Sequence, residues 1–446
     1  MKKIQSIQRL DTDSVAKSFI RYLVPSTIGM LLMAINIVAD GIMVGNRLGP
    51  VALGGVGIAI PVYTLFVAMS LWIGIGTATR FSSLMGAKRP EEAKIVFSHG
   101  MLSIFIVTLF IGLTAFPFRT QLAYLLGANA ETYPYVADYL YLMLLFGFVF
   151  TMENALSIMV RNDGSPNLAM ASLITTSLLN IGLNYIFLFV LDLGVMGAAA
   201  ATLLAAFIGM LVLSTHFFKK TNNLRFVRFR FSRKLLLLIL VIGFPSFLAE
   251  IGMSVFTISH NNVFERLAGT SGVSAFAILN YVHSVMLLAF LGMGSAIQPL
   301  VSYYSGAGER EKIRKTLQLA IGTAVAAGTA FFIVGQFFSG AIANVFGDFP
   351  DSVMDLAVPG IQLFFIAYLF MGTNFVMMTY YQSTGQIRMA TWITAAREIV
   401  VLLILLSILP VFFGVTGAWL AIPISEFIVL MTIVAYQRRW RTGRYG

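Results

Sequence analysis

One carboxylate interrupts the first long apolar stretch of the sequence. The segment NIVADGIMVG, residues 36–45, contains Asp40, with Asn36 one helical turn before it. At helical spacing Gly29, Met33, Asn36 and Asp40 share one face. A charge buried among apolar residues is costly unless it is paired or used. Asp40 is therefore either a functional carboxylate or a residue at the end of its helix that faces water.

Two amides and a hydroxyl supply further oxygen atoms. Asn180 and Asn184 lie four residues apart in LLNIGLNYIF, and Thr202 follows in the next apolar stretch. Carboxylate, amide and hydroxyl oxygens suit a proton relay or a hard monovalent cation better than a transition metal. The alternative is that the amides only join neighbouring helices by hydrogen bonds.

The elements that position these groups must be membrane helices. Of the 446 residues 58% are hydrophobic and 11% charged, and the mean hydropathy is +0.86. Apolar runs of about 20 residues can cross the hydrocarbon core as helices. We predict an all-α polytopic protein with twelve spans at 18–44, 51–79, 95–116, 135–160, 167–190, 195–218, 235–259, 272–303, 314–338, 356–382, 390–411 and 415–437.

The positive charges predict the topology. With both termini in the cytoplasm, only Arg47, Arg119 and Arg266 lie outside, so 27 of the 30 basic residues follow the positive-inside rule. The net charge of +11 is thus assigned to topology and not to nucleic acid binding. The first apolar run is followed by further spans, so we expect it to stay as a helix and not to be a cleaved signal peptide.

The sequence contains an internal repeat. Pro25 in RYLVPS recurs as Pro245 in VIGFPS, and GIGTA, MGAKRPEEAK and LGVMGAAAA have echoes in order at similar spacing. Each half holds six spans, so the two halves share one orientation, as in transporters with parallel repeats. We predict an N-terminal lobe at 1–218, a basic cytoplasmic linker at 219–234 and a C-terminal lobe at 235–446.

The second half lacks the polar cluster. Its counterparts of Asp40, Asn180, Asn184 and Thr202 fall near His260, Val400, Ile404 and Ile422. A cluster needed only for folding should occur in both halves, so its absence favours a function located in the first lobe. Intramembrane ionisable residues are functional by default. The roles of Glu153, Glu250 and Glu426 stay open at this point.

Several function classes are disfavoured. The sequence has no cysteine, no GxxxxGK[ST] phosphate loop, and no HExxH or GxSxG motif. We therefore expect no enzyme and no cofactor. A lipid or lipid-linked saccharide flippase is an alternative, although the spans contain few of the cations that would bind phosphates. A membrane enzyme and a non-transporting scaffold or receptor are further alternatives.

Four segments carry a resemblance to a known family: VADGIMVGNRLGPVALGGVGIAIPVYTL, GIGTATRFSSLMGAKRPEEAK, NxxxNxxF with LGVMGAAAAT, and GFPSFLAEIGMS. With them the chain resembles the multidrug and toxic compound extrusion (MATE) transporters over nearly its full length, and within these it is similar to the DinF-like branch. It implies a V-shaped pair of six-helix bundles in a bacterial cytoplasmic membrane. Such a protein exports organic, often cationic and amphipathic, compounds in exchange for protons or sodium. We expect it to act as a monomer.

The resemblance also implies residue roles. Asp40 would be the titrating or cation-binding carboxylate, with Asn180, Asn184 and Thr202 as its neighbours. The cavity of the first lobe would be lined by Met33, Asn36, Tyr139 and Asn154. Pro25 lacks a backbone N–H and would let the first helix bend.

One departure from the family pattern bears on the coupling ion. Many relatives have aspartate where this chain has Asn184, so the site here carries one formal charge. The missing anion weakens the attraction for sodium and removes a like charge that would have favoured protonation of Asp40. We expect proton coupling, with sodium bound near Asp40 as the alternative.

Overall fold

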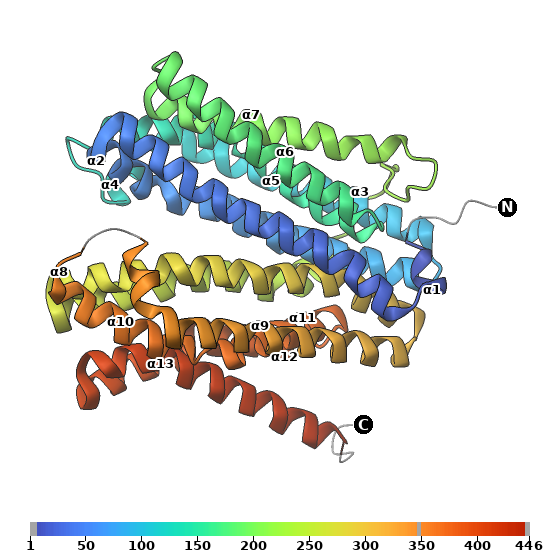
Figure 1. The fold of residues 1–446 in the computed structure, drawn as a ribbon. Helices are drawn as coiled ribbons and strands as arrows, with labels where there is room; N and C mark the ends of the chain where they lie inside the picture. The colour runs from blue at the N-terminus through green and yellow to red at the C-terminus, as the bar shows by residue number, and fades with distance from the viewer. Residues whose placement is uncertain (1–6, 346–348, 442–446) are drawn as a thin grey trace. The chain divides into compact units, whose positions relative to one another are not determined.

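The computed structural model describes residues 7–345 and 349–441, and this part of the chain is almost entirely helical (Figure 1). The α-helices are α1 Arg9–Thr12, α2 Val15–Gly86, α3 Pro90–Ala115, α4 Arg119–Leu125, α5 Tyr133–Asn162, α6 Pro166–Tyr185, α7 Gly194–Ser214, α8 Arg233–Ala307, α9 Arg310–Asn344, α10 Asp351–Phe365, α11 Tyr368–Ser383, α12 Ile387–Ala395 and α13 Val401–Arg441. Short 3₁₀ segments, η1 Phe116–Phe118 and η3 Thr215–Phe218, and π-helical segments, η2 Ile186–Val190 and η4 Ala396–Val400, adjoin them.

Local sequence explains where helices begin. The Ser14 side chain caps α2 by accepting a hydrogen bond from the Lys17 N–H, and Ser232 caps α8 in the same way. Proline stands in the first turn of α3, α5 and α6, where its missing N–H costs nothing. These capping and proline signals do not depend on hydropathy, and they agree with it on where the helices begin.

Helices α2 and α8 each contain two spans, and so does the continuous run Ile387–Arg438 formed by α12, η4 and α13. Non-helical backbone occurs at Gly49 in α2, Gly269 in α8 and Gly414 in α13. Helices α10 and α11 are long and apolar enough for one span when taken together, and they meet at a bend of 49°. Counted with these joints, the described residues form twelve apolar crossings, and each of the twelve predicted spans lies inside one of them. The predicted all-α class and the span count are confirmed.

The joints follow the repeat. Gly49 and Gly269 lie 220 residues apart and both have positive φ, of 83° and 56°. Gly194 and Gly414 have the same separation, with φ of 61° and 56°. Glycine has no Cβ and adopts this conformation without strain. The two halves therefore turn their chains at equivalent places.

The described chain divides into two compact units. Unit 1 contains 1–247 and 299–310, and unit 2 contains 248–298 and 311–446. Both ends of α8 thus belong to unit 1, whereas its middle belongs to unit 2. The division into lobes at 219–234 and the side of the membrane on which each end lies stay predictions.

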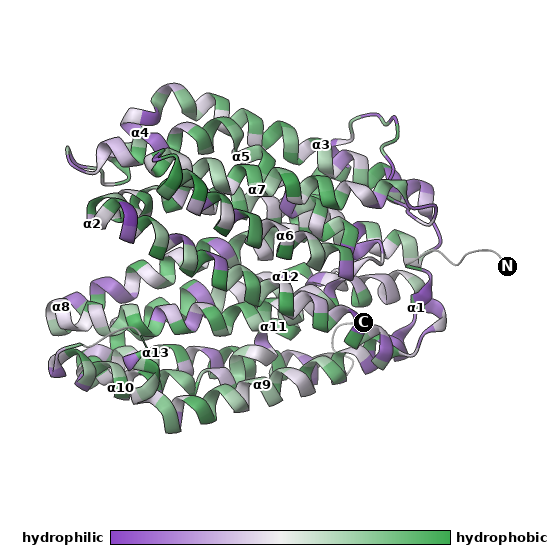
Figure 2. Ribbon diagram, turned by 45° about the horizontal axis from the view of Figure 1, so that its top comes forward, coloured by the Kyte–Doolittle hydropathy of each residue, from purple (hydrophilic) through white to green (hydrophobic). Residues whose placement is uncertain are grey.

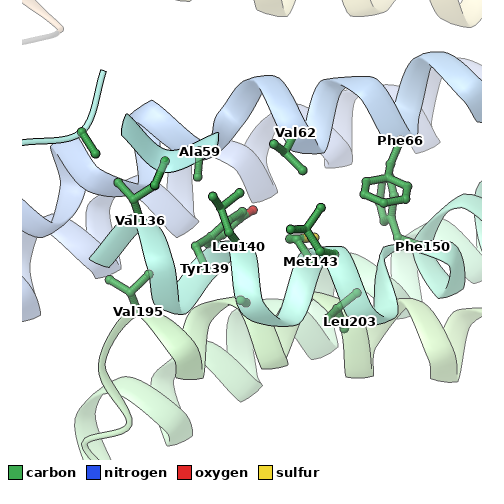
Figure 3. Close-up of a cluster of buried hydrophobic side chains, with 14 of the residues drawn as sticks. Ala59, Val62, Phe66, Val136, Tyr139, Leu140, Met143, Phe150, Val195 and Leu203 are labelled. Atoms are coloured by element: carbon green, nitrogen blue, oxygen red, sulfur yellow. The ribbon is translucent and has the colours of Figure 1, made fainter. Parts of the chain in front are cut away.

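Apolar side chains of three helices form a core of unit 1 (Figure 3). In Figure 3, α5 lies between α2 and α7, and the labelled side chains Phe66 of α2 and Phe150 of α5 point toward each other. The buried cluster includes Ala59, Val62, Phe66, Val136, Leu140, Met143, Val195 and Leu203. Hydrophilic residues gather mainly at helix ends and in connections (Figure 2), as expected for helices that expose apolar flanks to lipid.

Glycines allow α2 to approach both ends of α8 within unit 1. A Cβ added to Gly86 would overlap the carbonyl oxygen of Tyr303, and one added to Gly306 would overlap that of Ser83. Gly86 and Gly306 are equivalent positions of the repeat, and so are Ser83 and Tyr303. The contact is therefore reciprocal, and only glycine permits this backbone separation.

Candidate functional site

The polar residues predicted to surround Asp40 come from three helices of unit 1. Asp40 is on α2, Asn180 and Asn184 are on α6, and Thr202 is on α7. Asn184 Nδ2 donates a hydrogen bond of 2.5 Å to Asp40 Oδ1. Asp40 is half-buried, and both asparagines are buried. Helical spacing puts the two amides on one face, and packing of α6 against α2 and α7 supplies the other groups.

The amide of Asn180 lies between Asp40 and Thr202 and has two possible orientations. In the first, its oxygen accepts from Asn36 Nδ2 at 2.7 Å and from Asn184 Nδ2 at 3.3 Å. Its nitrogen then donates to Thr202 Oγ1 at 3.1 Å. In the reverse orientation, the nitrogen donates to Asp40 Oδ1 at 2.6 Å and the oxygen accepts from Thr202 Oγ1 at 3.1 Å. The nitrogen and the oxygen of an amide are told apart only by their hydrogen-bond partners.

Each orientation fits one charge state of Asp40. The first puts an amide oxygen 2.6 Å from Asp40 Oδ1, a distance at which two acceptors need a proton between them. The reverse gives the ionised carboxylate a second N–H donor beside that of Asn184. It also brings the Asn180 nitrogen to 2.7 Å from Asn36 Nδ2, so the Asn36 amide has to turn with it.

The same atoms can ligate a hard cation. Asn184 Oδ1 is buried and has no hydrogen-bond partner in the structure. Together with the oxygens of Asp40, Asn180 and Thr202 it offers the ligand type that sodium accepts. Within residues 7–345 and 349–441, no group of three or more His, Cys, Asp or Glu side chains is arranged to hold a metal ion.

The residues predicted to bind substrate are less closely grouped. Asn36 joins the cluster directly, since it donates to Asn180 and also to the Ser177 carbonyl oxygen at 3.4 Å. Tyr139 is buried in the core between α2 and α5 and is close enough to Asp40 to interact with it electrostatically. In the described part of the chain, no hydrogen bond joins Met33 or Asn154 to the cluster.

Pro25 lies inside α2, on the same helix as Asp40. Its ring removes the backbone hydrogen bond that would reach Arg21. The described backbone of α2 is nevertheless helical on both sides of Pro25, and its non-helical residue is Gly49. The bend at Pro25 stays a prediction about another conformation.

Sequence reasoning missed the main partner of Arg397. Arg397 Nε and Nη2 both lie 2.9 Å from Glu426 Oε1, to which Nε donates a hydrogen bond. The neighbouring Glu398 is farther away, with its Oε1 at 3.4 Å from Arg397 Nη2. Asn374 Nδ2 also donates to Glu426 Oε2 at 2.7 Å. All four side chains are buried in unit 2. The π-helical segment η4 carries Arg397 and Glu398, and such segments commonly occur at functional sites.

Two further carboxylates differ in their partners. Glu153 accepts hydrogen bonds from Thr176 at 3.1 Å and Ser172 at 3.4 Å inside unit 1, which gives it a structural explanation. Glu250 of α8 interacts with Glu398 as a like charge. A Cβ on Gly252, one half-turn further along, would overlap the Cβ of Glu398, so α8 passes directly over this residue.

The second-half counterparts of the Asp40 cluster form no polar site. His260 is buried, and its Nδ1 donates to the Phe256 carbonyl oxygen at 2.8 Å. Its ring stacks on Phe276 with a centroid separation of 5.1 Å. The other counterparts are the apolar residues Val400, Ile404 and Ile422. The oxygen-rich cluster is therefore specific to the first half.

Comparisons with known proteins agree with this architecture. The chain is 26% identical over 448 residues to the multidrug export protein MepA of Staphylococcus aureus strain MRSA252, covering 98% of this chain and 97% of that protein. MepA of Staphylococcus saprophyticus is equally similar, with 26% identity over 450 residues.

Solved structures of transporters share the fold of this chain. A MOP superfamily transporter from Pyrococcus furiosus superposes with a TM-score of 0.91, 25% identity and 98% coverage of both chains. A multidrug resistance MATE family transporter in an outward-facing conformation superposes with a TM-score of 0.91 and 25% identity, covering 98% of this chain and 97% of that one. The DinF-like branch stays a prediction.

A family model described as MatE matches the chain twice, over residues 25–186 and 245–409. The two matches begin at Pro25 and Pro245, the first pair of the internal repeat. They cover well over half of the sequence. With its twelve crossings, its repeated joints and its relatives of known activity, the chain belongs to the MatE family of membrane transporters.

Proposed function

We propose that this chain is a secondary active exporter of organic, often cationic and amphipathic, compounds, driven by a cation gradient with protons as the coupling ion. The multidrug export proteins that it resembles over nearly their full length support export of such compounds. The absence of a phosphate-binding loop from the sequence supports a gradient as the energy source.

The observation that carries proton coupling is the separation of 2.6 Å between the Asn180 amide and Asp40 Oδ1, which suits an amide oxygen facing a protonated carboxyl or an amide nitrogen facing a carboxylate. With its oxygen toward Asp40, the amide requires a protonated carboxyl. With its nitrogen toward Asp40, it stabilises the carboxylate and places its oxygen toward Thr202. Protonation thus changes the hydrogen bonds that connect α2, α6 and α7, which is a differential interaction of the kind that a conformational equilibrium requires.

The proposed cycle follows from this exchange. A proton from outside neutralises Asp40, the Asn36 and Asn180 amides turn, and α2 bends at Pro25 so that the cavity lined by Met33, Asn36, Tyr139 and Asn154 releases its compound. Loss of the proton to the cytoplasm restores the binding form. One charge moving through 100 mV contributes about 2.3 kcal/mol, which corresponds to between one and two decades of concentration ratio.

Sodium is the alternative coupling ion. The unpartnered Asn184 Oδ1 favours it, because a bound cation would satisfy this buried oxygen. The single formal charge of the site disfavours it, since sodium would have to compete with a proton for one carboxylate. We propose that the protein works as a monomer in a bacterial cytoplasmic membrane with both termini inside.

The test is Asp40→Asn in sealed vesicles loaded with a fluorescent organic cation, with proton and sodium gradients imposed separately. We expect gradient-driven efflux to be lost while the protein stays folded, because asparagine can still accept from Asn184 Nδ2. Glu153→Gln is the matched control, since it removes another buried carboxylate of unit 1 that has its own partners. Full efflux by Asp40→Asn, or equal loss in the control, would refute the assignment.

A further inference from the structure

The linker 219–234 is fixed along α3 in unit 1 by specific contacts. It runs as an extended segment between α7 and α8 (Figure 1). The Val227 N–H donates to Ser98 Oγ at 2.9 Å, and Ser98 Oγ donates to the Arg225 carbonyl oxygen at 3.3 Å. The Ser232 N–H donates to His99 Nε2 at 3.2 Å. These bonds hold the backbone of the linker against the start of α3.

A buried aspartate anchors the beginning of the linker. Asp163 accepts from the Asn223 N–H at 2.8 Å, from Asn223 Nδ2 at 2.7 Å and from His216 Nε2 at 2.7 Å. All three side chains are buried. The linker is therefore an ordered part of unit 1.

The linker presents positive charge without compensating negative charge. It carries seven cations, Lys219, Lys220, Arg225, Arg228, Arg230, Arg233 and Lys234. The sequence contains no acidic residue between Asp192 and Glu250. The arginines Arg225, Arg228 and Arg230 are exposed, and no ion pair involves any of the seven cations in the described part of the chain. These cations are therefore available to bind an anionic partner.

A cavity of about 230 Å³, partly open to the surface, lies against linker residues Phe226, Val227 and Phe229, which are neighbours of these arginines in the sequence. Its walls come from α3, α5 and the linker and include Met101, Leu102, Phe105, Met152, Phe226 and Phe229. Its one polar wall residue is Ser98, whose hydroxyl is already hydrogen-bonded to the linker. Ordered water needs two to four polar partners, so the cavity suits an apolar group.

Exposed aromatic residues continue this apolar surface outward. Phe226 is 63% exposed and Phe231 is 68% exposed, while their rings contact Phe97 and His99 on α3 with centroid separations of 4.9 Å and 5.1 Å. Arginine and phenylalanine thus recur in RFVRFRF, residues 225–231, between the candidate spans Gly194–Phe218 and Arg233–Ala307. Basic residues next to a span attract anionic lipids, and aromatic residues favour the headgroup level.

We propose that the linker and this cavity bind one anionic phospholipid from the adjacent leaflet. An acyl chain occupies the cavity between α3 and α5, and the headgroup phosphate lies against Arg225, Arg228 and Arg230. The charge of the linker selects the anion, and the apolar walls select a lipid over a free phosphate. The site is separate from Asp40, so it adds a lipid requirement to the proposed export function without depending on it.

The test uses the purified full-length chain in uncharged detergent. Dioctanoyl phosphatidylglycerol, dioctanoyl phosphatidylcholine and inorganic phosphate are titrated separately, and bound molecules are counted by native mass spectrometry. We expect phosphatidylglycerol to bind with at least tenfold higher affinity than phosphatidylcholine. Its binding should weaken when the ammonium acetate concentration rises from 50 to 500 mM, because exposed charges are screened.

Two variants separate headgroup from acyl chain. The triple variant R225Q/R228Q/R230Q should bind phosphatidylglycerol about a hundredfold more weakly, since each cation near a membrane surface contributes about a factor of five. Leu102→Trp narrows the cavity without changing charge and should weaken both lipids. The matched control K88Q/R314Q/R388Q removes three exposed cations elsewhere and should bind like the unaltered chain.

Several results would overturn the proposal. Equal affinity of the unaltered chain for the two lipids would remove the role of charge, and so would binding that salt does not change. An equal loss in the control triple variant would mean that net charge matters and the linker does not. Displacement of the lipid by phosphate at equal concentration would reduce the site to a simple anion site. The unaltered chain alone decides three of these outcomes, so a variant that fails to fold does not end the test.

Discussion

Asn184→Asp is the most direct probe of the coupling ion. Asn184 Nδ2 now donates to Asp40 Oδ1 at 2.5 Å, so aspartate at this position would place two carboxylates side by side. Two unit charges about 4 Å apart repel by about 4 kcal/mol at an effective dielectric constant of about 20. This energy corresponds to about a thousandfold change in an equilibrium constant.

The variant can relieve this repulsion by binding a cation. A sodium ion between the two carboxylates would have both charges as ligands, together with the oxygens of Asn180 and Thr202. We therefore expect Asn184→Asp to gain efflux that depends on sodium, whereas the unaltered chain responds to a pH gradient alone. The assay is efflux of a fluorescent organic cation from vesicles, with sodium and proton gradients imposed one at a time.

Asn184→Ser is the matched control, because it loses the hydrogen bond to Asp40 without adding charge. It should show no stimulation by sodium. The reasoning is wrong if the efflux rate of Asn184→Asp is indifferent to sodium. It is equally wrong if serine produces the same stimulation, since the effect would then come from the lost hydrogen bond.

Three further predictions concern stability. Gly306→Ala should lower the melting temperature by an amount equivalent to about 1–3 kcal/mol, since the new methyl group meets the Ser83 backbone, whereas Gly322→Ala, which has open space, should not. Arg397→Gln should lower the free energy of unfolding by about 3–5 kcal/mol, because it leaves the buried Glu426 carboxylate without its cation. Adding Glu426→Gln should restore part of this loss, and no restoration would mean that the pair contributes nothing to stability. Partial burial opposes ionisation of Asp13, but hydrogen bonds from Lys17 and Arg21 and their charges lower its pKa below the usual 3.8. Asp13→Asn should therefore be less stable than the unaltered chain at neutral pH, and this difference should vanish as pH falls below about 4. A difference in stability that persists in acid would contradict this.

Hydropathy and turn chemistry predicted most of the fold. The twelve spans follow from apolar runs of sufficient length, because lipid requires each crossing to satisfy its own backbone hydrogen bonds. The break between the first two spans follows from Gly49 before Pro50, a pair that favours a turn. The placing of Asn180 and Asn184 on one face needed only the period of a helix.

Contacts between distant residues could not be predicted in the same way. Arg397 and Glu398 are neighbours in the sequence, but the structure gives Arg397 a shorter contact with Glu426, on another helix. The anchoring of the linker by Asp163 depends on the packing of α5, α7 and the linker together. The orientation of the Asn180 amide depends on which atoms of Asp40, Asn36, Asn184 and Thr202 surround it, and helical spacing alone does not give these contacts.

The paired joints at Gly49 and Gly269, and at Gly194 and Gly414, indicate how the two halves diverged after a duplication. Both copies of the repeat turn at these glycines, whereas the polar residues around Asp40 occur in the first copy alone. Under the proposed function, exchange of the four counterpart positions for the first-half residues would therefore add a second cation site to a half whose chain already turns at the equivalent glycines. Such a second site would change the number of ions coupled to each transport cycle.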